Sequence, residues 1–272
     1  MRKLFKAQTS EGYTIKVLAD LLQNNIKTAC LLVDERGMHL TMFDSHRRVC
    51  FAFDLLAENF QVYKFRPSNS LYLGLNLGHF YKMIKSIKKK DSIVLFIKAE
   101  NPTDLGIKVV PKENNRITTS YIKIQNIQNL DVTLPDGYTN PIIVPSNEYQ
   151  KMCKDMNTIS TSVKVAAKKY SIRFACDAGS VYSREVSFGE LDADSDSDEE
   201  DDQVRYSDSF HTEQLSRIVK VAGLGDNIQV YVSDDLPMMF RTNVGTLGRL
   251  SIYIKSRTLI DNEGRPAPTL SN

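Results

Sequence analysis

The chain has 272 residues, of which 42% are hydrophobic and 25% are charged, so it can bury the core of one or two ordinary domains. Its formal net charge of +2 hides an uneven distribution, because residues 192–202 hold eight of the 33 acidic side chains. Outside that run, 35 basic residues stand against 25 acidic ones, a net charge of +10. Consecutive carboxylates without the glycine spacing of an EF-hand are typical of a solvated insertion rather than a metal site.

The cysteines and the hydropathy pattern exclude several classes of protein. Cys30, Cys50, Cys153 and Cys176 lie scattered in apolar or strand-like runs, with no CxxC and no Cys/His ligand spacing. No apolar stretch approaches the length of a membrane span, and the N-terminus lacks the apolar region of a signal peptide. We therefore expect an intracellular protein with reduced cysteines, no metal and no cofactor.

The first half of the chain predicts a helix, five strands, a second helix and three further strands. The two helices contain the segments Lys16–Leu21 and Lys82–Ile87. Apolar runs bounded by Gly, Asp, Ser and Pro predict strands at residues 28–34, 38–43, 49–55, 60–65, 71–75, 92–98, 105–110 and 117–124. The polar segment 126–141 breaks this pattern and predicts an interdomain connector, although it keeps apolar residues at Ile127, Leu130, Val132 and Leu134.

The second half repeats the order of the first. Its helices contain Lys151–Met156 and Arg217–Ala222, and its strands are predicted at residues 162–167, 171–177, 181–188, 205–210, 228–232, 238–244 and 249–254. This order predicts an α+β fold of two similar domains, residues 1–125 and 142–257, each a curved antiparallel sheet backed by two amphipathic helices. We expect the acidic loop 191–203 to interrupt the second domain and residues 258–272 to form a flexible tail.

The four helical segments share a pattern of apolar residues on one side and basic residues on the other. The first and third segments start 135 residues apart, as do the second and fourth, which indicates a duplicated unit. Lysines on a solvated helix face are common, but such faces usually mix acids with bases. The stretch 82–90 carries Lys82, Lys85, Lys88, Lys89 and Lys90 with no acid, which favours a polyanionic partner.

The sequence contains none of the common catalytic signatures. The motifs GxxxxGK[ST], GxSxG, HExxH and GxGxxG are absent, and the four histidines are dispersed without a partnered Asp or Cys. The repeated helices offer mainly lysine rather than the Arg, Asn and Gln side chains that read base edges. A protein that binds a polyanion is therefore favoured over an enzyme, and sequence-specific recognition of DNA is disfavoured. A nuclease or other DNA-modifying enzyme stays as an alternative.

Several short motifs, in order over nearly the whole chain, resemble the sliding clamps of the proliferating cell nuclear antigen type. These clamps have a Gly-x-x-Leu-x-x-Met-Asp-Ser turn where this chain has Gly37–Ser45. The resemblance continues through Phe60-x-x-Tyr63, Gly74-x-Asn76-Leu77, Pro145-Ser146-x-Glu148-Tyr149, Asp235-Leu236-Pro237 and Gly248-x-Leu250-x-x-Tyr253. Its divergence is typical of a member from a large DNA virus or a protist.

The resemblance implies a head-to-tail homotrimeric ring whose helices line a channel around duplex DNA. By position, the implied DNA-binding residues are Lys16, Lys82, Lys85, Lys88, Lys89, Lys151, Lys154, Arg217 and Lys220. Ring closure would pair the edge strand that carries Leu105, Ile107 and Val109 with the strand of the next subunit that carries Val186 and Phe188. The lysine that is modified in the family falls on Lys169.

The resemblance also implies partners that bind through short peptides. The implied pocket consists of Phe43, Arg47, Cys50, Leu130, Val132, Pro237, Tyr253 and Ile254, and it would hold the PIP-box-like peptide of a DNA polymerase or another partner. Phe43 replaces the usual Met, and Lys255-Ser256 replaces a small residue and proline, so the pocket departs from the family pattern. A clamp loader is the further expected partner, and the expected location is the nucleus, or a host replication site for a viral chain. The alternative within the family is a non-trimeric relative, either a subunit of a heterotrimeric checkpoint clamp or a monomeric viral processivity factor.

Overall fold

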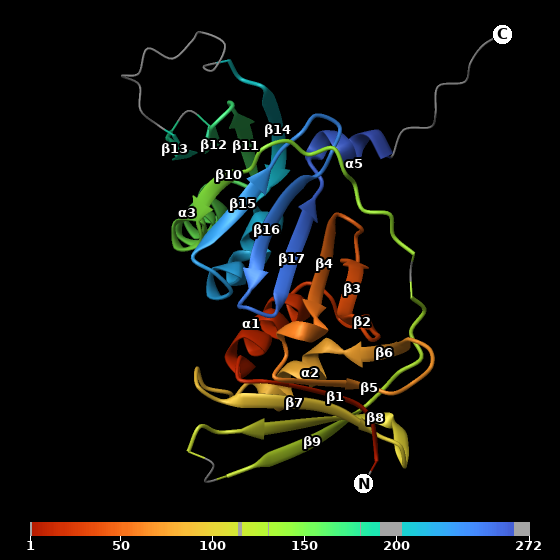
Figure 1. The fold of residues 1–272 in the computed structure, drawn as a ribbon. Coiled ribbons are helices and arrows are strands. Elements are labelled where there is room, and N and C mark those ends of the chain that lie inside the picture. Colours follow the sequence, from red (N-terminus) through yellow and green to blue (C-terminus); the bar gives the residue numbers. More distant parts are fainter. Residues whose placement is uncertain (1, 114–115, 130, 180, 191–202, 264–272) are drawn as a thin grey trace, which may run out of the picture. The chain divides into compact units, whose positions relative to one another are not determined.

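The computed structural model describes residues 2–113, 116–129, 131–179, 181–190 and 203–263 (Figure 1). The chain divides into two compact units. Unit 1 comprises residues 1–133, 220–225 and 241–252, and unit 2 comprises residues 134–219, 226–240 and 253–272. Each unit combines antiparallel strands with helices, which confirms the predicted α+β class.

Unit 1 contains a five-stranded sheet in the order β5-β1-β7-β8-β9. Its strands are β1 (Lys3–Thr9), β5 (Val62–Phe65), β7 (Ser92–Lys98), β8 (Asn101–Val110) and β9 (Thr118–Lys123). Every pairing in this sheet is antiparallel. Phe5, Leu95, Ile97, Leu105 and Ile107 are almost completely buried, so one face of the sheet covers the core of the unit.

The other strands of unit 1 follow the order β17-β4-β3-β2-β6. They are β2 (Thr28–Val33), β3 (Gly37–Phe43), β4 (Val49–Leu56), β6 (Leu71–Asn76) and the first five residues of β17 (Gly248–Ile254). The short 3-10 helix η1 (Ala57–Asn59) follows β4. A second layer of strands therefore completes the core of this unit.

Helices α1 (Gly12–Gln23) and α2 (Leu77–Ile84) pack against each other in unit 1. Their apolar residues, including Ile15, Leu18 and Phe80, lie in the same apolar cluster as Leu95 and Leu105 of the five-stranded sheet. The α1 start requires a glycine, because a Cβ at position 12 would lie 2.6 Å from the carbonyl oxygen of Asp91. Asn76 caps α2, and its side chain accepts a hydrogen bond of 2.9 Å from the amide of His79.

Unit 2 contains a four-stranded sheet in the order β13-β12-β11-β14, together with strands β10 and β15 and the start of β16. The bounds are β10 (Ile142–Pro145), β11 (Ser162–Ala167), β12 (Ser171–Asp177), β13 (Ser183–Gly189), β14 (Tyr206–His211), β15 (Asn227–Tyr231) and β16 (Met238–Val244). Strands β16 and β17 each contribute residues to both units. The core of unit 2 includes Phe174, Phe210 and Phe240, all nearly inaccessible to solvent.

The helices of unit 2 are α3 (Ser146–Ile159), α4 (Thr212–Arg217) and α5 (Arg257–Glu263). Helices α3 and α4 are joined by hydrogen bonds from Tyr149 to the carbonyl of Leu215 and from Ser216 to the carbonyl of Cys153, each 3.3 Å long. After a break at Ile218, the chain continues as the 3-10 helix η2 (Val219–Gly223).

The structure confirms most of the predicted strands and corrects three expectations. Strands β1 and β10 were not predicted, and the predicted fourth helix is split into α4 and η2. Residues 257–263 form helix α5, so the expectation of a flexible tail from residue 258 is wrong for this part. The acidic loop 191–203 lies outside the described residues except for its last position, as do Leu130 and residues 264–272.

Candidate nucleic-acid interface

Lys16 of α1 is engaged within unit 1. Its Nζ donates a 2.8 Å hydrogen bond to the carbonyl oxygen of Ile87, and it lies 5.0 Å from the centre of the Tyr13 ring. The carbonyl of Ile87 follows the end of α2, so this lysine ties the two helices together. Its assignment to DNA binding stays a prediction, whereas its contact within unit 1 is structural.

The lysines of α2 are more available. Lys82 lies in the last turn of the helix, and Lys85 is its C-terminal cap residue. Both are exposed, and neither forms an ion pair within the described part of the chain. Cations near a helix C-terminus are favoured by the helix dipole, which holds them there without a carboxylate partner.

The next lysines lie in the turn that follows α2 rather than on the helix. The amide of Asp91 donates to the carbonyl of Lys88 at 3.0 Å, and the amide of Lys88 donates to the Asp91 carboxylate at 2.9 Å. These two bonds fix a tight turn that exposes Lys89 and Lys90 at its centre. The turn thus presents a rigid basic tip between α2 and β7.

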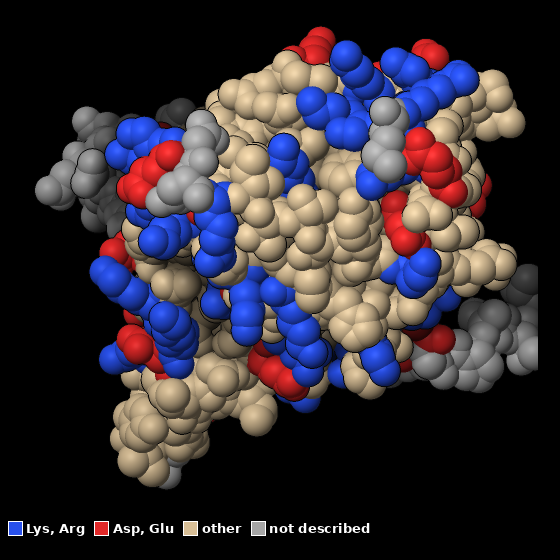
Figure 2. Space-filling model, turned by 90° about the horizontal axis from the view of Figure 1, so that it is seen from below, with Lys and Arg blue, Asp and Glu red and all other residues tan. Residues whose placement is uncertain are grey.

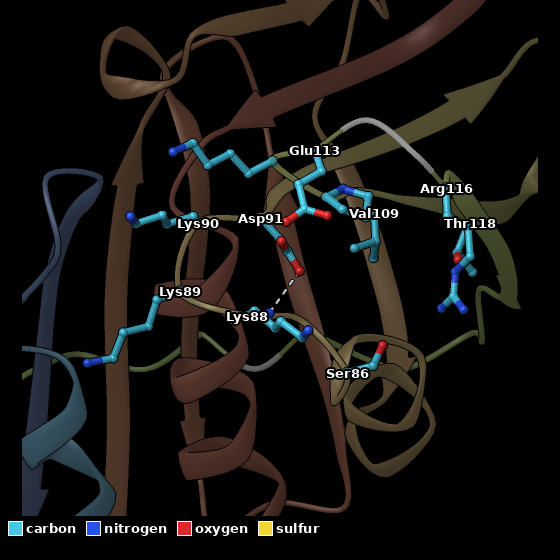
Figure 3. A pocket seen from close by; sticks show the side chains of 11 residues that line it. Ser86, Lys88, Lys89, Lys90, Asp91, Val109, Glu113, Arg116 and Thr118 are labelled. Carbon is cyan, nitrogen blue, oxygen red and sulfur yellow. Dashed lines mark hydrogen bonds between the residues drawn. The ribbon is translucent and has the colours of Figure 1, made fainter.

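A cavity of about 750 Å³ lies beside this turn. Its basic lining residues are Lys88, Lys89, Lys90, Lys112 and Arg116, from the α2–β7 turn and the segment between β8 and β9. In Figure 3, Lys89 and Lys90 point to the same side, whereas Asp91 and Glu113 lie at the centre of the group. The basic lining of the cavity therefore extends the basic surface of α2, and the carboxylates of Asp91 and Glu113 also line the cavity.

Lys220 of η2 is paired with an acid. Its Nζ lies 2.9 Å from Oδ2 of Asp20 on α1, and the Lys220 side chain is 48% exposed. The hydrogen bond to Asp20 raises the pKa of Lys220 above its ordinary value. The ion pair keeps Lys220 charged and fixes its position, but the Asp20 carboxylate also offsets part of the positive potential of Lys220.

The cations of unit 2 differ in their availability. Lys151 on α3 forms an ion pair of 2.7 Å with Glu148, one turn earlier on the same helix, and Arg217 on α4 pairs with Glu213 in the same way. Lys154 is exposed and has no ion pair within the described residues. These helices therefore place acidic residues beside basic ones, whereas the sequence predicted faces of mostly one sign of charge.

Within the described residues, strands β9 and β13 each lie at the edge of a sheet and leave backbone groups without a partner strand. In unit 1, the amide of Ile124 bonds to the carbonyl of Thr103 at 2.9 Å. Because hydrogen-bonded pairs alternate in an antiparallel ladder, this bond leaves the N–H and C=O groups of Thr119 and Tyr121 on the free side of β9. In unit 2, the amide of Glu190 bonds to the carbonyl of Tyr170. The same alternation therefore leaves the N–H and C=O groups of Glu185 and Ser187 on the free side of β13.

The predicted interface residues of β8 do not lie at an edge. Strand β8 pairs with β7 on one side and β9 on the other. Leu105, Ile107 and Val109 are buried in the core of unit 1, with at most 8% of their surface exposed. The expectation that this strand forms a subunit boundary is therefore wrong, and the edge strand is its neighbour β9.

Strand β13 is an edge strand, as predicted, but its two predicted residues differ. Val186 is half-buried, whereas Phe188 is only 8% exposed. The Phe188 ring meets Phe174 edge to face, with 6.1 Å between ring centres. Phe188 thus belongs to the core of unit 2, and its replacement by a charged residue would damage the fold itself.

The predicted peptide-binding residues of unit 1 lie around the turn between β3 and β4. Phe43 is paired with the buried Cys50 across these strands, and the guanidinium of Arg47 lies 5.1 Å from the Phe43 ring centre. Arg47 has a φ of 55°, a left-handed conformation that few side chains adopt. Val132 of the connector is half-buried.

In unit 2, the predicted residues surround Tyr138, which the sequence analysis did not single out. The hydroxyl of Tyr138 donates a 2.6 Å hydrogen bond to the carbonyl of Pro237, and its ring lies 6.3 Å from that of Tyr253 and 6.1 Å from that of Tyr231. Tyr253 is largely buried and Ile254 is completely buried. Ile254 therefore presents no exposed surface to a partner in this unit.

The remaining candidates are a modified lysine and a metal site. Lys169 lies in the turn between β11 and β12, with its Nζ 4.8 Å from the Tyr170 ring centre. The described residues contain no group of three or more His, Cys, Asp and Glu side chains arranged to hold a metal ion. Within the same residues, no helix is long and apolar enough to cross a membrane.

Comparison with known proteins decides the family. The N-terminal domain of the proliferating cell nuclear antigen matches residues 4–133, and the C-terminal domain of the same antigen matches residues 134–257. The chain belongs to the proliferating cell nuclear antigen family. Members of this family are DNA sliding clamps, non-enzymatic scaffold proteins that act with DNA and DNA polymerases.

Similar proteins come from viruses and from a eukaryote. A probable DNA polymerase sliding clamp 1 of Paramecium bursaria Chlorella virus 1 is 24% identical over 255 residues, 92% of this chain and 96% of the viral one. The proliferating cell nuclear antigen of Chaetomium thermophilum is 24% identical over 257 residues, 92% of this chain and 97% of its own length. A probable DNA polymerase sliding clamp of Autographa californica nuclear polyhedrosis virus is 23% identical over 266 residues, 96% of this chain and 99% of that one.

Proposed function

We propose that this clamp encircles duplex DNA as a homotrimeric ring and tethers polymerases and other replication and repair proteins to it. The observation that carries the proposal is a set of exposed lysines on or beside the helices of both units. Lys82 and Lys85 in unit 1 and Lys154 in unit 2 have no ion pair among the described residues. Each of them is free to exchange one phosphate for the next.

Lysine suits this role because its ammonium is a mobile point charge on a flexible stem. A closed ring does not need tight contacts, because it can leave the DNA only by opening or at an end. Weak contacts of this kind keep the ring mobile along the duplex. Tethering raises the effective concentration of polymerase at the primer end without catalysis.

The free edges of β9 and β13 support assembly. One edge belongs to unit 1 and the other to unit 2, so head-to-tail pairing of copies uses a different edge on each side. An exposed edge left unpaired invites uncontrolled association, and pairing in a closed ring removes that hazard. We assign the subunit boundary to β9 of one copy and β13 of the next.

Partner binding is assigned to the connector and its neighbours. We propose that Phe43, Arg47, Val132, Pro237 and Tyr138 contact a peptide with an apolar residue and two aromatic anchors, and that a clamp loader places the ring on DNA. The sites of action would be the nucleus or, for a viral chain, the host nucleus or a cytoplasmic replication site. Lys169 remains the candidate for modification.

The experiment uses linear duplex DNA fixed to a bead at one end. The clamp is threaded at low salt, the free end is blocked with a bulky protein, and the bead is washed at high salt. We expect the wild-type protein to stay on blocked DNA and to leave when a restriction enzyme opens it. The triple variant Lys82→Glu, Lys85→Glu, Lys154→Glu should thread poorly, with each lost contact lowering the log–log salt dependence by up to about 0.9.

A matched control variant makes the same change of charge elsewhere. Lys27, Lys164 and Arg257 are exposed and lie off helices α1 to α4, so their replacement by Glu should leave threading unchanged. Equal loss of the wild-type protein from blocked and open DNA at high salt would contradict the ring. Equal threading by both triple variants would contradict the assigned DNA contacts.

A further inference from the structure

The outward face of the five-stranded sheet in unit 1 carries a row of basic and aromatic residues. Lys6 pairs with Phe96, Phe96 with Gly106, and Gly106 with Tyr121. Directly paired residues project from the same face of a sheet, so this row crosses strands β1, β7, β8 and β9. The alternate residues on these strands, such as Leu95, point into the core with helices α1 and α2.

The aromatic part of the row has one buried and one exposed ring. A Cβ at position 106 would lie 2.4 Å from the Phe96 ring, so this ring lies directly over the glycine. Phe96 meets Tyr121 edge to face, with 6.0 Å between ring centres and an interplanar angle of 86°. Phe96 is buried, whereas Tyr121 is 50% exposed. Tyr121 is thus a ring held in place by its neighbour and open to solvent.

Several lysines converge on these rings. The Nζ of Lys3 lies 4.5 Å from the Phe96 ring centre, and that of Lys98 lies 5.2 Å from the Tyr121 ring centre. Burial lowers the pKa of Lys3, and the ammonium groups of Lys6, Lys108 and Lys98 lower it further. Ammonium groups close enough to lower a neighbour's pKa repel one another, and a bound anion would relieve that repulsion.

Acidic side chains near the row leave most of this charge uncompensated. Asp104 is neutralised by Lys123, whose Nζ lies 2.6 Å from its Oδ1. A hydrogen bond to Tyr121 raises the pKa of Lys98, and the charge of Glu100 contributes to this rise. Lys3, Lys6 and Lys108 form no ion pair within the described residues. Basic side chains also predominate over acidic ones on the face of the molecule shown in Figure 2.

We propose that this face binds single-stranded nucleic acid, with its phosphates on Lys3, Lys6 and Lys108 and a base stacked against Tyr121. Lys6 and Lys108 lie on strands separated by one strand and are offset by two residues along them, so their backbones are about 12 Å apart, a span that a flexible phosphodiester chain can bridge. A base can stack on a protein ring only when it is free of its own helix. Charge alone would accept any polyanion, but the exposed ring favours unpaired bases over duplex DNA or an acidic peptide.

The structural alternative is that the lysine stems merely cover Phe96, as long basic side chains often cover apolar surface. Lysine-to-glutamine substitutions separate the two interpretations, because glutamine keeps much of the stem and removes the charge. Lys123 provides the matched control, since it lies on the same face and is already paired with Asp104. The variant Tyr121→Leu removes the ring and keeps an apolar side chain.

The test measures fluorescence anisotropy of labelled oligothymidylate of about 16 nucleotides, a length typical of single-stranded sites, over a range of salt concentrations. We expect Lys3→Gln, Lys6→Gln, Lys108→Gln to flatten the log–log salt slope by about 2, since each single-strand phosphate contact contributes about 0.7. Tyr121→Leu should weaken binding about 5- to 150-fold, the usual range for one stacked base. Lys123→Gln should change neither quantity, and native mass measurement should show that all variants assemble as the wild type does.

Two comparisons separate this inference from the proposed clamp function. The variant Lys82→Glu, Lys85→Glu, Lys154→Glu should lose duplex threading but retain oligothymidylate binding. Loss of that binding in this variant, with full binding by the Lys3, Lys6 and Lys108 variant, would overturn the inference and leave the clamp function intact. Tighter binding of a peptide with the sequence of residues 192–202, or of a 16-base-pair duplex, to the same lysines would also overturn it.

Discussion

Substitution of Ser187 by proline tests the assigned subunit boundary at the level of a single backbone group. Ser187 lies in β13, opposite Arg173 of β12, in a pair that the alternation leaves without hydrogen bonds between the two strands. Its N–H therefore points to the free edge, and proline removes it without breaking a bond inside unit 2. The Pro ring also occupies the position where the next copy's strand would lie.

The size of the expected shift from trimer to monomer follows from the number of interfaces in the ring. One backbone hydrogen bond contributes about 0.5–1.5 kcal/mol net, so its loss weakens each interface up to about tenfold before the steric effect of the ring is added. A closed trimer has three identical interfaces, so the equilibrium between monomer and trimer shifts by up to about a thousandfold. Native mass spectrometry and sedimentation at micromolar concentration should then find folded monomers.

Controls distinguish the edge from the fold. Ser187→Ala keeps every backbone group and should assemble normally. Val186→Pro removes a bond to Phe174 inside the sheet of unit 2 and should lower the melting temperature instead. On the other edge, Thr119→Pro should give monomers for the same reason as Ser187→Pro, because its N–H faces the free side of β9.

A mixture of the two monomeric variants gives the sharpest test. The Ser187→Pro chain keeps an intact β9 edge and the Thr119→Pro chain an intact β13 edge, so together they should form one head-to-tail dimer and nothing larger. A wild-type mass for either variant alone would refute the edge assignment. A mixture that stays monomeric, or that closes into trimers, would refute the head-to-tail pairing of β9 with β13.

Two further predictions concern the peptide site and the buried thiols. Phe43→Ala combined with Val132→Ala should weaken the binding of a Gln-x-x-apolar-x-x-aromatic-aromatic peptide at least about tenfold, measured by calorimetry, because a few anchors carry most of such an affinity. The control Ile127→Ala changes a connector residue that lies against Gly74 and should leave peptide binding unchanged. Equal losses of affinity in the two variants would contradict the assigned site. Burial raises the pKa of Cys153 from 9.0 to about 12, with a hydrogen bond to Tyr149 acting in the opposite direction, so the folded protein keeps a proton that the unfolded chain releases above pH 9. The free energy of unfolding should therefore fall between pH 9 and 12, by up to about 1.4 kcal/mol per pH unit for this thiol, and Cys153→Ala should reduce the slope; an unchanged slope in urea denaturation would contradict the assignment.

The sequence predicted most of the strands because their apolar residues alternate or run continuously, and it failed where that signal is short or mixed. Strand β1 mixes lysines at its first and fourth positions with apolar residues, and β10 has only four residues before α3. The edge of unit 1 was assigned to β8, whose apolar alternation in fact reflects burial between two neighbours. The true edge, β9, is largely polar, as exposed edges usually are.

The candidate site shows a similar limit. The spacing of lysines predicted which helix positions are basic, but not which cations have partners, because ion pairs such as Lys220 with Asp20 join residues far apart in sequence. Tyr138 was missed because its neighbours Tyr231, Tyr253 and Pro237 come together only in the folded unit. Phe188 was predicted at the surface because alternation on an edge strand does not reveal that Phe174 covers it.

The four duplicated helical segments differ in whether their cations have partners within the protein, and this difference suits a sliding protein. The first cation of the first segment, Lys16, bonds the end of α2, and those of the third and fourth, Lys151 and Arg217, pair with acids on their own helices. Cations held by protein partners keep the helices positioned but offer phosphates only a fraction of their charge. Under the proposed function, the exposed cations of the second segment would move from one phosphate to the next. A surface on which few cations are free has a shallow energy profile along DNA, which favours sliding over tight binding at any one position.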